Sequence, residues 1–290
     1  MNFRTDLALE RCENLGENEL EGIEIRSFES DKAKVTRIKV FNSKGAETVG
    51  KPIGSYVTVE VEPFANHAHF IDSSLETVAN EIKLLLPEKG SVLVAGLGNM
   101  KITPDALGPK CASMIFATRH ITGELLKATG FENLRTVSAF PTGVLGETGA
   151  EAGEIIKGAV QTLGIDAVIT IDALAARNVG RLGTTVQMCN TGIVPGSGVG
   201  NSRQEISERT VGVPVIAIGV PTVVDAATLI YDFAGDVAIE KDVLRRQERM
   251  MVTPREVDLM IERAAKLTSL AINRALQPEI SPEDMIMLTS

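Results

Sequence analysis

Two aspartates carry the clearest chemical signal in this sequence. Asp105 follows the apolar run 91–95 and the glycine-containing segment 96–99 that ends it, and Asp172 comes directly after the apolar run 167–171. Each run is predicted to be a strand, so each aspartate is expected at the carboxyl edge of a sheet, where open α/β folds bind ligands. Two carboxylates in one crevice can activate water and protonate a leaving group. The pattern therefore predicts a hydrolase with Asp105 and Asp172 as catalytic residues.

Each aspartate also has a simpler explanation. Thr103, Pro104 and Asp105 suit the start of a helix, where a carboxylate caps free N–H groups, and Asp172 could cap a helix in the same way. Their joint occurrence after two predicted strands favours the catalytic interpretation. Arg177 follows Asp172 closely and could orient a carboxylate or stabilise an oxyanion; its alternative is a surface arginine that pairs with a helix end.

A glycine-rich segment, residues 195–201, is a candidate substrate or oxyanion site. Its members Gly196, Ser197, Gly198 and Gly200 could expose backbone N–H groups to a developing negative charge. A flexible connection between two elements is the simpler interpretation of such a composition. Asp225 also follows an apolar run, but we expect it one turn inside a helix and rank it below the other two aspartates.

Other site chemistries have weaker support. The third glycine of a dinucleotide fingerprint would fall at Lys101, so Gly96 and Gly98 are interpreted as a sharp turn after the strand. His67 and His69 have neither nearby cysteines nor the spacing of a zinc-binding helix, so we expect neither a metal nor a cofactor. His120, in a predicted helix, is expected to be structural or on the surface.

Composition narrows the partners and the compartment. The 290 residues carry a formal net charge of -9, with two tyrosines and no tryptophan, which argues against direct nucleic-acid binding. No apolar run approaches the roughly 20 residues that cross a bilayer, so no membrane contact is expected. The three scattered cysteines indicate a reducing, cytoplasmic compartment rather than a disulfide framework.

The elements that must position these residues alternate between strand and helix patterns. Strands are predicted at 34–41, 55–61, 91–95, 136–140, 167–171 and 213–220, and helices at 73–86, 109–128, 149–163, 223–229 and 253–276. Ser73 or Ser74 is the expected N-cap of the first helix, and Thr253 with Pro254 that of the last. This order predicts an α/β fold with a mostly parallel sheet and helices on both faces. We expect one domain over 1–290, with a β-rich appendage at 1–62 and a C-terminal helix within 250–278. Residues 236–249 are expected to be a solvated connection.

Seven segments form an ordered series of motifs over nearly the whole chain. They are RTDLA at 4–8, GLGN at 96–99, TPDALGP at 103–109, IDALAAR at 171–177, PGSGVGN at 195–201, PVIAIG at 214–219 and MVTP at 251–254. Together they closely resemble the germination proteases of spore-forming bacteria. Two departures from that family are visible: only three residues precede Arg4, where the family has a propeptide, and the segment between Asp232 and Met251 is short.

The resemblance implies an atypical aspartic-type endopeptidase with a fold similar to hydrogenase-maturation peptidases. It implies that the enzyme is made as a zymogen, works as a homo-oligomer, a tetramer in the family, and cleaves small acid-soluble spore proteins in the cytoplasm of the spore core. The family's two active-site aspartates fall on Asp105 and Asp172. The alternatives are a metal-dependent peptidase like those that mature hydrogenases, and a binding protein of the same fold without catalytic activity.

Overall fold

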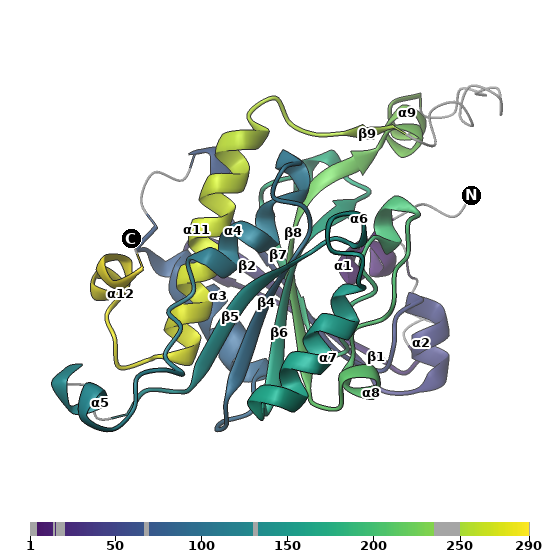
Figure 1. The fold of residues 1–290 in the computed structure, drawn as a ribbon. Coiled ribbons are helices and arrows are strands. Elements are labelled where there is room, and N and C mark those ends of the chain that lie inside the picture. Colours follow the sequence, from purple (N-terminus) through teal and green to yellow (C-terminus); the bar gives the residue numbers. More distant parts are fainter. Residues whose placement is uncertain are drawn as a thin grey trace.

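A nine-stranded mixed sheet forms the centre of the molecule (Figure 1). The computed structural model describes residues 5–13, 15, 21–66, 70–129, 133–234 and 250–289. The strand order is β1-β2-β3-β7-β8-β6-β4-β5, with β9 paired to β8. The strands are β1 (Ile23–Ser30), β2 (Ala33–Val40), β3 (Gly54–Glu60), β4 (Val92–Leu97), β5 (Val137–Gly143), β6 (Ala167–Ala176), β7 (Thr185–Cys189), β8 (Val215–Asp225) and β9 (Met251–Val252).

The parallel part of the sheet confirms the predicted fold class. Strands β5, β4, β6 and β8 are parallel neighbours. Strands β1, β2, β3 and β7 are antiparallel and continue the same sheet from β8. The β-rich segment predicted as an appendage at 1–62 is therefore an extension of the central sheet, joined to it by the β3–β7 pairing.

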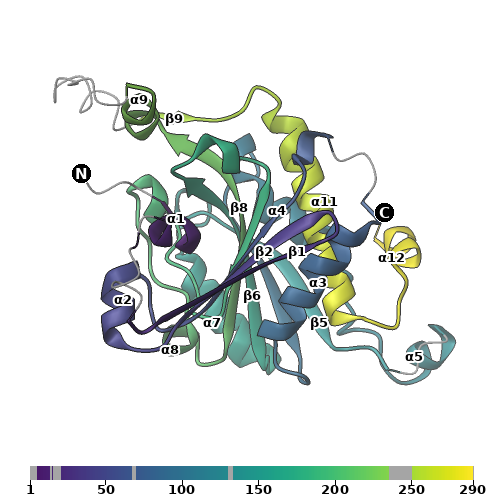
Figure 2. The ribbon, with the colours of Figure 1, turned by 180° about the vertical axis from the view of Figure 1, so that it is seen from behind.

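Helices cover both faces of the sheet, as the sequence predicted. On one face α3 (Ser73–Leu85), α4 (Leu107–Ser113) and α11 (Val257–Leu276) pack into the largest hydrophobic cluster. On the other face α7 (Ala152–Leu163) covers a second cluster, and α1 (Ala8–Cys12) and α2 (Ser43–Val49) cover a third. Figure 2 shows the same layers from behind, with α3 in front of the sheet. The shorter helices are η2 (Phe64–Asn66), η3 (Thr103–Asp105), α5 (Gly123–Thr129), α6 (Leu145–Thr148), η4 (Val179–Arg181), η5 (Ser197–Val199), α8 (Glu208–Val211), α9 (Ala226–Ala234) and α12 (Pro282–Leu288).

The helix predicted over 109–128 is wrong. Helix α4 ends at Ser113, and the chain then runs extended beside the start of β5 before α5 begins. The backbone N–H groups of Thr118 and Arg119 both donate to the carbonyl of Val137, at 3.0 Å each. These tertiary hydrogen bonds satisfy the backbone outside a helix, so the local helical pattern does not decide the structure.

Two predicted N-caps are also wrong. Asp72, rather than a serine, caps α3, because its Oδ1 accepts from the N–H groups of Ser74 (2.9 Å) and Leu75 (3.4 Å). Helix α11 begins at Val257, and the Thr253 hydroxyl donates instead to the carbonyl of Thr222 in β8. The cap of α3 is thus the residue just before the predicted serines, whereas Thr253 has a partner 31 residues away in β8.

The remaining expectations from composition can be compared with the described residues. All three cysteines are free and buried. Within the described ranges, no helix is long and apolar enough to cross a membrane. The connection expected at 236–249 lies outside the residues that the structure describes, as do His67 and His69.

Candidate active site

Three glycines bring the segment before α4 directly onto the sheet. A Cβ atom added to Gly96 would lie 2.1 Å from the carbonyl oxygen of Gly108, and one on Gly108 would lie 2.2 Å from the carbonyl oxygen of Leu97. Gly98 has a φ of +107°, which side chains rarely adopt, and its Cβ would lie 2.1 Å from the carbonyl oxygen of Asp105. The glycines therefore serve a tight turn and a close backbone approach, and this approach places Asp105 beside the end of β4.

Asp105 is half-buried at the end of the η3 turn. Its Oδ2 accepts the backbone N–H of Asn99 at 2.7 Å, and it makes no capping hydrogen bond to α4. Burial raises the pKa of the Asp105 carboxyl, and the Asn99 hydrogen bond opposes this rise by supporting the carboxylate. The helix-cap explanation of this aspartate is therefore excluded, and its carboxylate faces a cleft instead.

Asp172 lies inside a strand rather than at its end, which corrects the predicted boundary. Strand β6 continues to Ala176 because β8 pairs with it over this length, whereas β4 pairs with β6 only as far as Ile171. Asp172 is thus the first residue of β6 beyond the end of β4, and relative to β4 it does occupy the carboxyl edge. It starts no helix, so the capping explanation fails here too.

The environment of Asp172 strongly favours its protonated form. The residue is 6% exposed, and its Oδ1 accepts the N–H of Ala173 at 2.9 Å. Burial raises the pKa of Asp172 well above its usual value, and the charges of Asp105 and Asp6 raise it further. Two carboxyls with environments this different can hold a shared proton on one member and leave the other ionised.

Asp6 is a third carboxylate that the sequence analysis did not select. Its backbone N–H donates to the carbonyl of Ala175 (3.0 Å), and its Oδ2 accepts the Ala175 N–H (2.9 Å). Its Oδ1 accepts the hydroxyl of Ser197 at 2.9 Å. Asp6 therefore ties the N-terminal segment and the glycine-rich segment to β6, next to Asp172. In the sequence, Asp6 belongs only to the RTDLA motif at residues 4–8.

The three aspartates share one cleft. This cleft has a volume of about 580 Å³, and its lining includes Asp6, Asp105 and Asp172 together with residues of the 143–146 and 195–204 segments. Its apolar walls include Leu97, Ile102, Leu145 and Val199. A cleft with convergent carboxyls of perturbed pKa is the usual form of an acid–base site.

The glycine-rich segment borders this cleft but uses most of its own N–H groups. Those of Ser197 and Gly200 donate to the carbonyls of Val194 and Ser197, both at 3.2 Å, so they are not free to bind an oxyanion. Gly196 and Gly200 have φ values of +72°, which explains two of the glycines as turn positions. Gly198 packs against Asp6: a Cβ there would lie 2.1 Å from Asp6 Oδ2. Any oxyanion role in this segment is confined to the N–H groups of Gly196 and Gly198.

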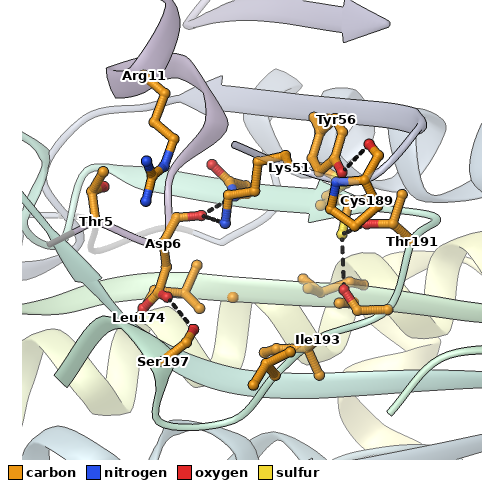
Figure 3. Close-up of a pocket in the computed structure, with 18 of the residues that line it drawn as sticks. Thr5, Asp6, Arg11, Lys51, Tyr56, Leu174, Cys189, Thr191, Ile193 and Ser197 are labelled. Carbon is orange, nitrogen blue, oxygen red and sulfur yellow. Dashed lines mark hydrogen bonds between the residues drawn. The ribbon is translucent and has the colours of Figure 1, made fainter. Parts of the chain in front are cut away.

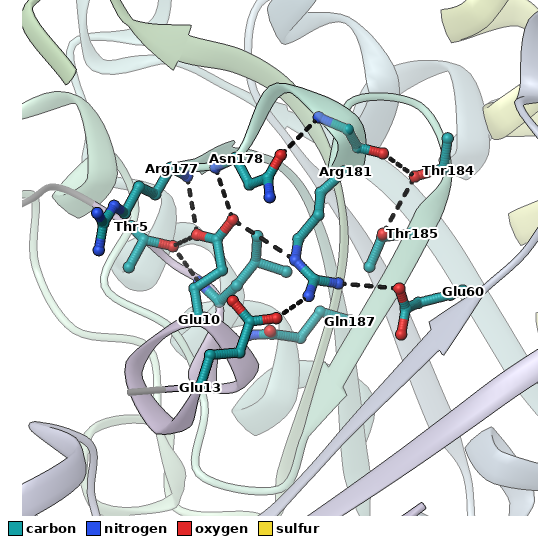
Figure 4. Close-up of polar contacts among 12 residues, drawn as sticks. Thr5, Glu10, Glu13, Glu60, Arg177, Asn178, Arg181, Thr184, Thr185 and Gln187 are labelled. Atoms are coloured by element: carbon teal, nitrogen blue, oxygen red, sulfur yellow. Dashed lines mark hydrogen bonds and ion pairs between the residues drawn. The ribbon is translucent and has the colours of Figure 1, made fainter. Parts of the chain in front are cut away.

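Arg177 does not line the cleft, although the sequence made it a candidate. Because β6 runs on past Asp172, Arg177 lies five residues, or about 16 Å, farther along the chain. Its backbone N–H donates to Glu10 Oε2 at 2.8 Å, and its side chain lies beside Thr5 (Figure 4). Arg177 is not among the residues that line the cleft, and its predicted role toward a carboxylate or an oxyanion stays a prediction.

Figure 4 shows a network of polar contacts around Glu10 and Arg181. Glu10, whose side chain is 1% exposed, accepts the N–H of Asn178 at 2.8 Å and faces the Arg181 guanidinium, which also pairs with Glu13 and Glu60. A buried charge held by several partners fixes its element firmly. This network holds α1 against the end of β6 and thereby keeps Asp6 in the cleft.

Two other candidates lie elsewhere. Asp225 is the last residue of β8, and its Oδ1 accepts the N–H of Thr228 at 3.1 Å, so it caps α9 rather than lying inside that helix. His120 is exposed, in agreement with a surface role. Among the residues that the structure describes, no three His, Cys, Asp or Glu side chains are placed to hold a metal ion.

Asp6→Asn should move the pH dependence of the site without unfolding it. The amide oxygen can still accept the Ala175 N–H, and its NH₂ group can donate to the Ser197 hydroxyl, so the contacts are kept while a negative charge is lost. Because that charge raises the pKa of Asp172, we expect the pKa of Asp172 to fall. The pH profile of hydrolysis at low substrate should show the change; an unaltered profile would mean that Asp6 acts only as a structural tether.

Comparisons with known proteins agree with the motifs. A family model described as germination protease matches residues 5–241. A germination protease of Caldanaerobacter subterraneus is 42% identical over 99% of this chain and 98% of its own length. One from Clostridium perfringens is 39% identical over 98% of each chain. Among solved structures, a NiFe hydrogenase maturation protease, HycI, of Thermococcus kodakarensis matches 66% of this chain and 98% of its own, at 15% identity and a TM-score of 0.36.

Proposed function

Because this chain belongs to the germination protease family, we propose that it is an endopeptidase that cleaves small acid-soluble spore proteins during germination, with Asp105 and Asp172 as its acid–base pair. The observation that carries the proposal is the meeting of these two carboxyls in one cleft, where burial and mutual repulsion raise the pKa of Asp172. Family membership supports the protease activity, and the cleft supports the choice of residues.

In this proposal Asp105 is the general base and Asp172 the general acid. The Asn99 N–H stabilises the Asp105 carboxylate, whereas Asp172 is deeply buried and faces two like charges, so the first proton leaves Asp105. Asp105 takes a proton from the attacking water, whose oxygen forms a bond to the scissile carbonyl carbon. Asp172 then gives its proton to the leaving nitrogen as the C–N bond breaks. The proton held by Asp105 returns to Asp172 before the next turnover.

An extended segment of substrate fits this cleft best. The cleft runs between the sheet edge and the 195–204 segment, and a strand-like peptide places its carbonyl groups at regular intervals along such a surface. Gly198 also lines the cleft, and we propose that its N–H group faces the carbonyl oxygen that becomes negative. We further propose that the enzyme acts in the spore core as a homo-oligomer, as the family does.

Digestion of a purified small acid-soluble spore protein, with and without a chelator, tests this function. Cleavage that is equal in both samples supports the aspartate mechanism. Cleavage lost with the chelator would indicate a metal-dependent peptidase of the hydrogenase-maturation kind, and binding without cleavage would indicate a protein with the fold but without the activity. Mass spectrometry of the products separates cutting within the chain from trimming at its ends.

Substrate bound to DNA should be spared. A peptide must be extended to enter the cleft, and binding to DNA orders the substrate and surrounds it with phosphates. The enzyme carries a net charge of -9, so those phosphates repel it. Time courses of digestion at matched ionic strength, with and without saturating DNA, should show cleavage of the free protein alone. Equal rates in the two samples would contradict this expectation.

A further inference from the structure

Strand β8 contains an irregularity where it passes the catalytic cleft. Its residues pair in order with those of β6 as far as Leu174, which lies opposite Pro221. The next residue of β6, Ala175, lies opposite Val223, so Thr222 is an extra residue of β8, a β-bulge. Figure 3 shows Leu174, the last residue before this shift, in the wall of a neighbouring cavity. Bulges are frequent beside active sites, because the extra residue changes the direction in which a side chain points.

The side chain of the extra residue reaches the turn that carries Asp105. Thr222 is 1% exposed and lines the catalytic cleft, and its hydroxyl donates to the carbonyl of Pro104 at 2.8 Å. Pro104 precedes Asp105 in η3 and has no backbone N–H, so its carbonyl is the one backbone polar group by which it can be held. The bulge therefore ties η3 to the sheet.

This hydrogen bond acts on the peptide unit that joins Pro104 to Asp105. The carbonyl of that unit accepts from Thr222, and its N–H donates to the carbonyl of Ile102 at 2.8 Å. Because a peptide unit is planar, a partner at each end fixes the orientation of the whole plane. The position of the Asp105 Cα atom follows from that plane, and the N–H of Asn99 holds the carboxylate at the other end of the side chain.

The bulge is itself held by two other segments of the chain. The N–H of Gly183 donates to the carbonyl of Pro221 at 3.0 Å, and the hydroxyl of Thr253 donates to the carbonyl of Thr222, also at 3.0 Å. Gly183 follows η4, and Thr253 follows β9, which lies beside the end of β8 (Figure 1). A group that positions a catalytic side chain must be fixed by its own neighbours, and Thr222 meets this condition.

We propose that Thr222 is a positioning residue for Asp105, and that it acts through the Pro104 carbonyl to hold this carboxylate where it can work together with Asp172. The inference rests on the proposed function, in which Asp105 is the general base. A displacement of about 1 Å in a catalytic group can lower the rate on the order of 10²-fold, so one hydrogen bond at this place has a large effect on turnover. A threonine that only stabilised the fold would have no such effect.

Thr222→Val removes the hydroxyl at nearly constant volume. We expect kcat on a purified spore protein to fall about 10- to 100-fold with KM changed less than about twofold, because the walls of the cleft stay in place. Thr222→Ser keeps the donor and should keep most of the activity. An unchanged kcat in Thr222→Val, or an equal loss in Thr222→Ser, would overturn the proposal.

Thr118→Val is the matched control for stability. Thr118 is 2% exposed, and its hydroxyl donates to the carbonyl of Arg135, outside the cleft. The variant should therefore unfold at a lower temperature than wild type and keep its kcat. If its kcat fell as much as that of Thr222→Val, the effect of Thr222 would be one of stability alone, and the positioning role would be refuted.

The backbone amide signal of Asn99 reports the position of Asp105 without requiring catalysis. This N–H donates to Asp105 Oδ2 at 2.7 Å, and a displaced carboxylate would weaken the bond. In proton–nitrogen correlation NMR spectra, the Asn99 proton signal should move upfield in Thr222→Val and stay in place in Thr222→Ser and Thr118→Val. An unmoved signal in Thr222→Val would refute the positioning role, and cleavage by the wild-type protein would then leave the proposed function intact. A moved signal in a protein whose wild type does not cleave would support the hold on Asp105 and refute the proposed function.

Discussion

Asp172→Asn is expected to reduce peptide cleavage by about 10²–10⁴-fold while the protein stays folded. The amide has nearly the volume of the carboxyl and its oxygen can still accept the Ala173 N–H, but it cannot donate a proton to the leaving nitrogen. Initial rates on a spore protein, with circular dichroism as the check on folding, measure the effect. Asp166→Asn is the matched control, because that aspartate lies outside the cleft; activity of Asp172→Asn within a few-fold of wild type would exclude Asp172 from catalysis.

The direction in which Asp172→Asn changes the stability of the fold follows from the pKa of Asp172. Burial raises the pKa of Asp172 in the folded protein above that in the unfolded chain. Such a group stabilises the fold fully below its unfolded pKa, and this stability is lost as the pH rises through its folded pKa. Asparagine carries no such loss, so near neutral pH the variant should unfold at the same temperature as wild type or a higher one.

Asp105→Asn should reduce peptide cleavage by about as much as Asp172→Asn does, because no base then takes a proton from the attacking water. The double variant should be little slower than either single variant, since two residues that act on one proton transfer contribute as a unit. Multiplicative losses would show that the two carboxyls act in separate steps. The two single variants also differ in their effect on the remaining carboxyl. Asp105→Asn removes a charge that raises the pKa of Asp172, whereas Asp172→Asn leaves Asp105 hydrogen-bonded to the N–H of Asn99.

Gly108→Ala is expected to cost about 3 kcal/mol of folding free energy and most of the activity. Its new methyl group would lie 2.2 Å from the carbonyl oxygen of Leu97 and 2.4 Å from that of Ile171. Both contacts are backbone atoms of central strands, so α4 must move away from the sheet, and Asp105 moves with it. Thermal unfolding and initial rates, measured together, follow both consequences.

Gly158→Ala is the matched control for this substitution. Gly158 lies in α7, where an added Cβ meets nothing within 4 Å, so alanine should stabilise the helix by about 0.5–1 kcal/mol and leave activity unchanged. If Gly108→Ala behaved like Gly158→Ala, the close approach of α4 to the sheet would not be what positions Asp105.

The sequence alone could predict the features that depend on short segments of the chain. Apolar runs that end at glycine or aspartate pointed to Asp105 and Asp172, and the meeting of both in one cleft follows from parallel strands that share an edge. Their catalytic role stays a prediction. The strand boundary after Ile171 was missed because its extension depends on pairing with β8, whose partner residues are far along the chain. The same error made Arg177 appear nearer to the site than it is.

Long-range contacts explain the other differences. Asp6 enters the cleft through hydrogen bonds to Ala175 and Ser197, 169 and 191 residues away, and no local pattern encodes such pairings. Propensity and periodicity describe each element, whereas the site depends on which elements become neighbours.

The central claim is that Asp105 and Asp172 form one coupled acid–base pair, and titration of the carboxyls tests it most directly. Carbon-13 NMR of protein labelled at the aspartate carboxyl should show one signal with a pKa well above the usual range, absent from Asp172→Asn. In Asp105→Asn the pKa of that signal should fall, because the neighbouring charge is gone. A folded wild-type protein in which every aspartate titrates in the ordinary range, or a raised pKa that Asp105→Asn leaves unchanged, would contradict the account.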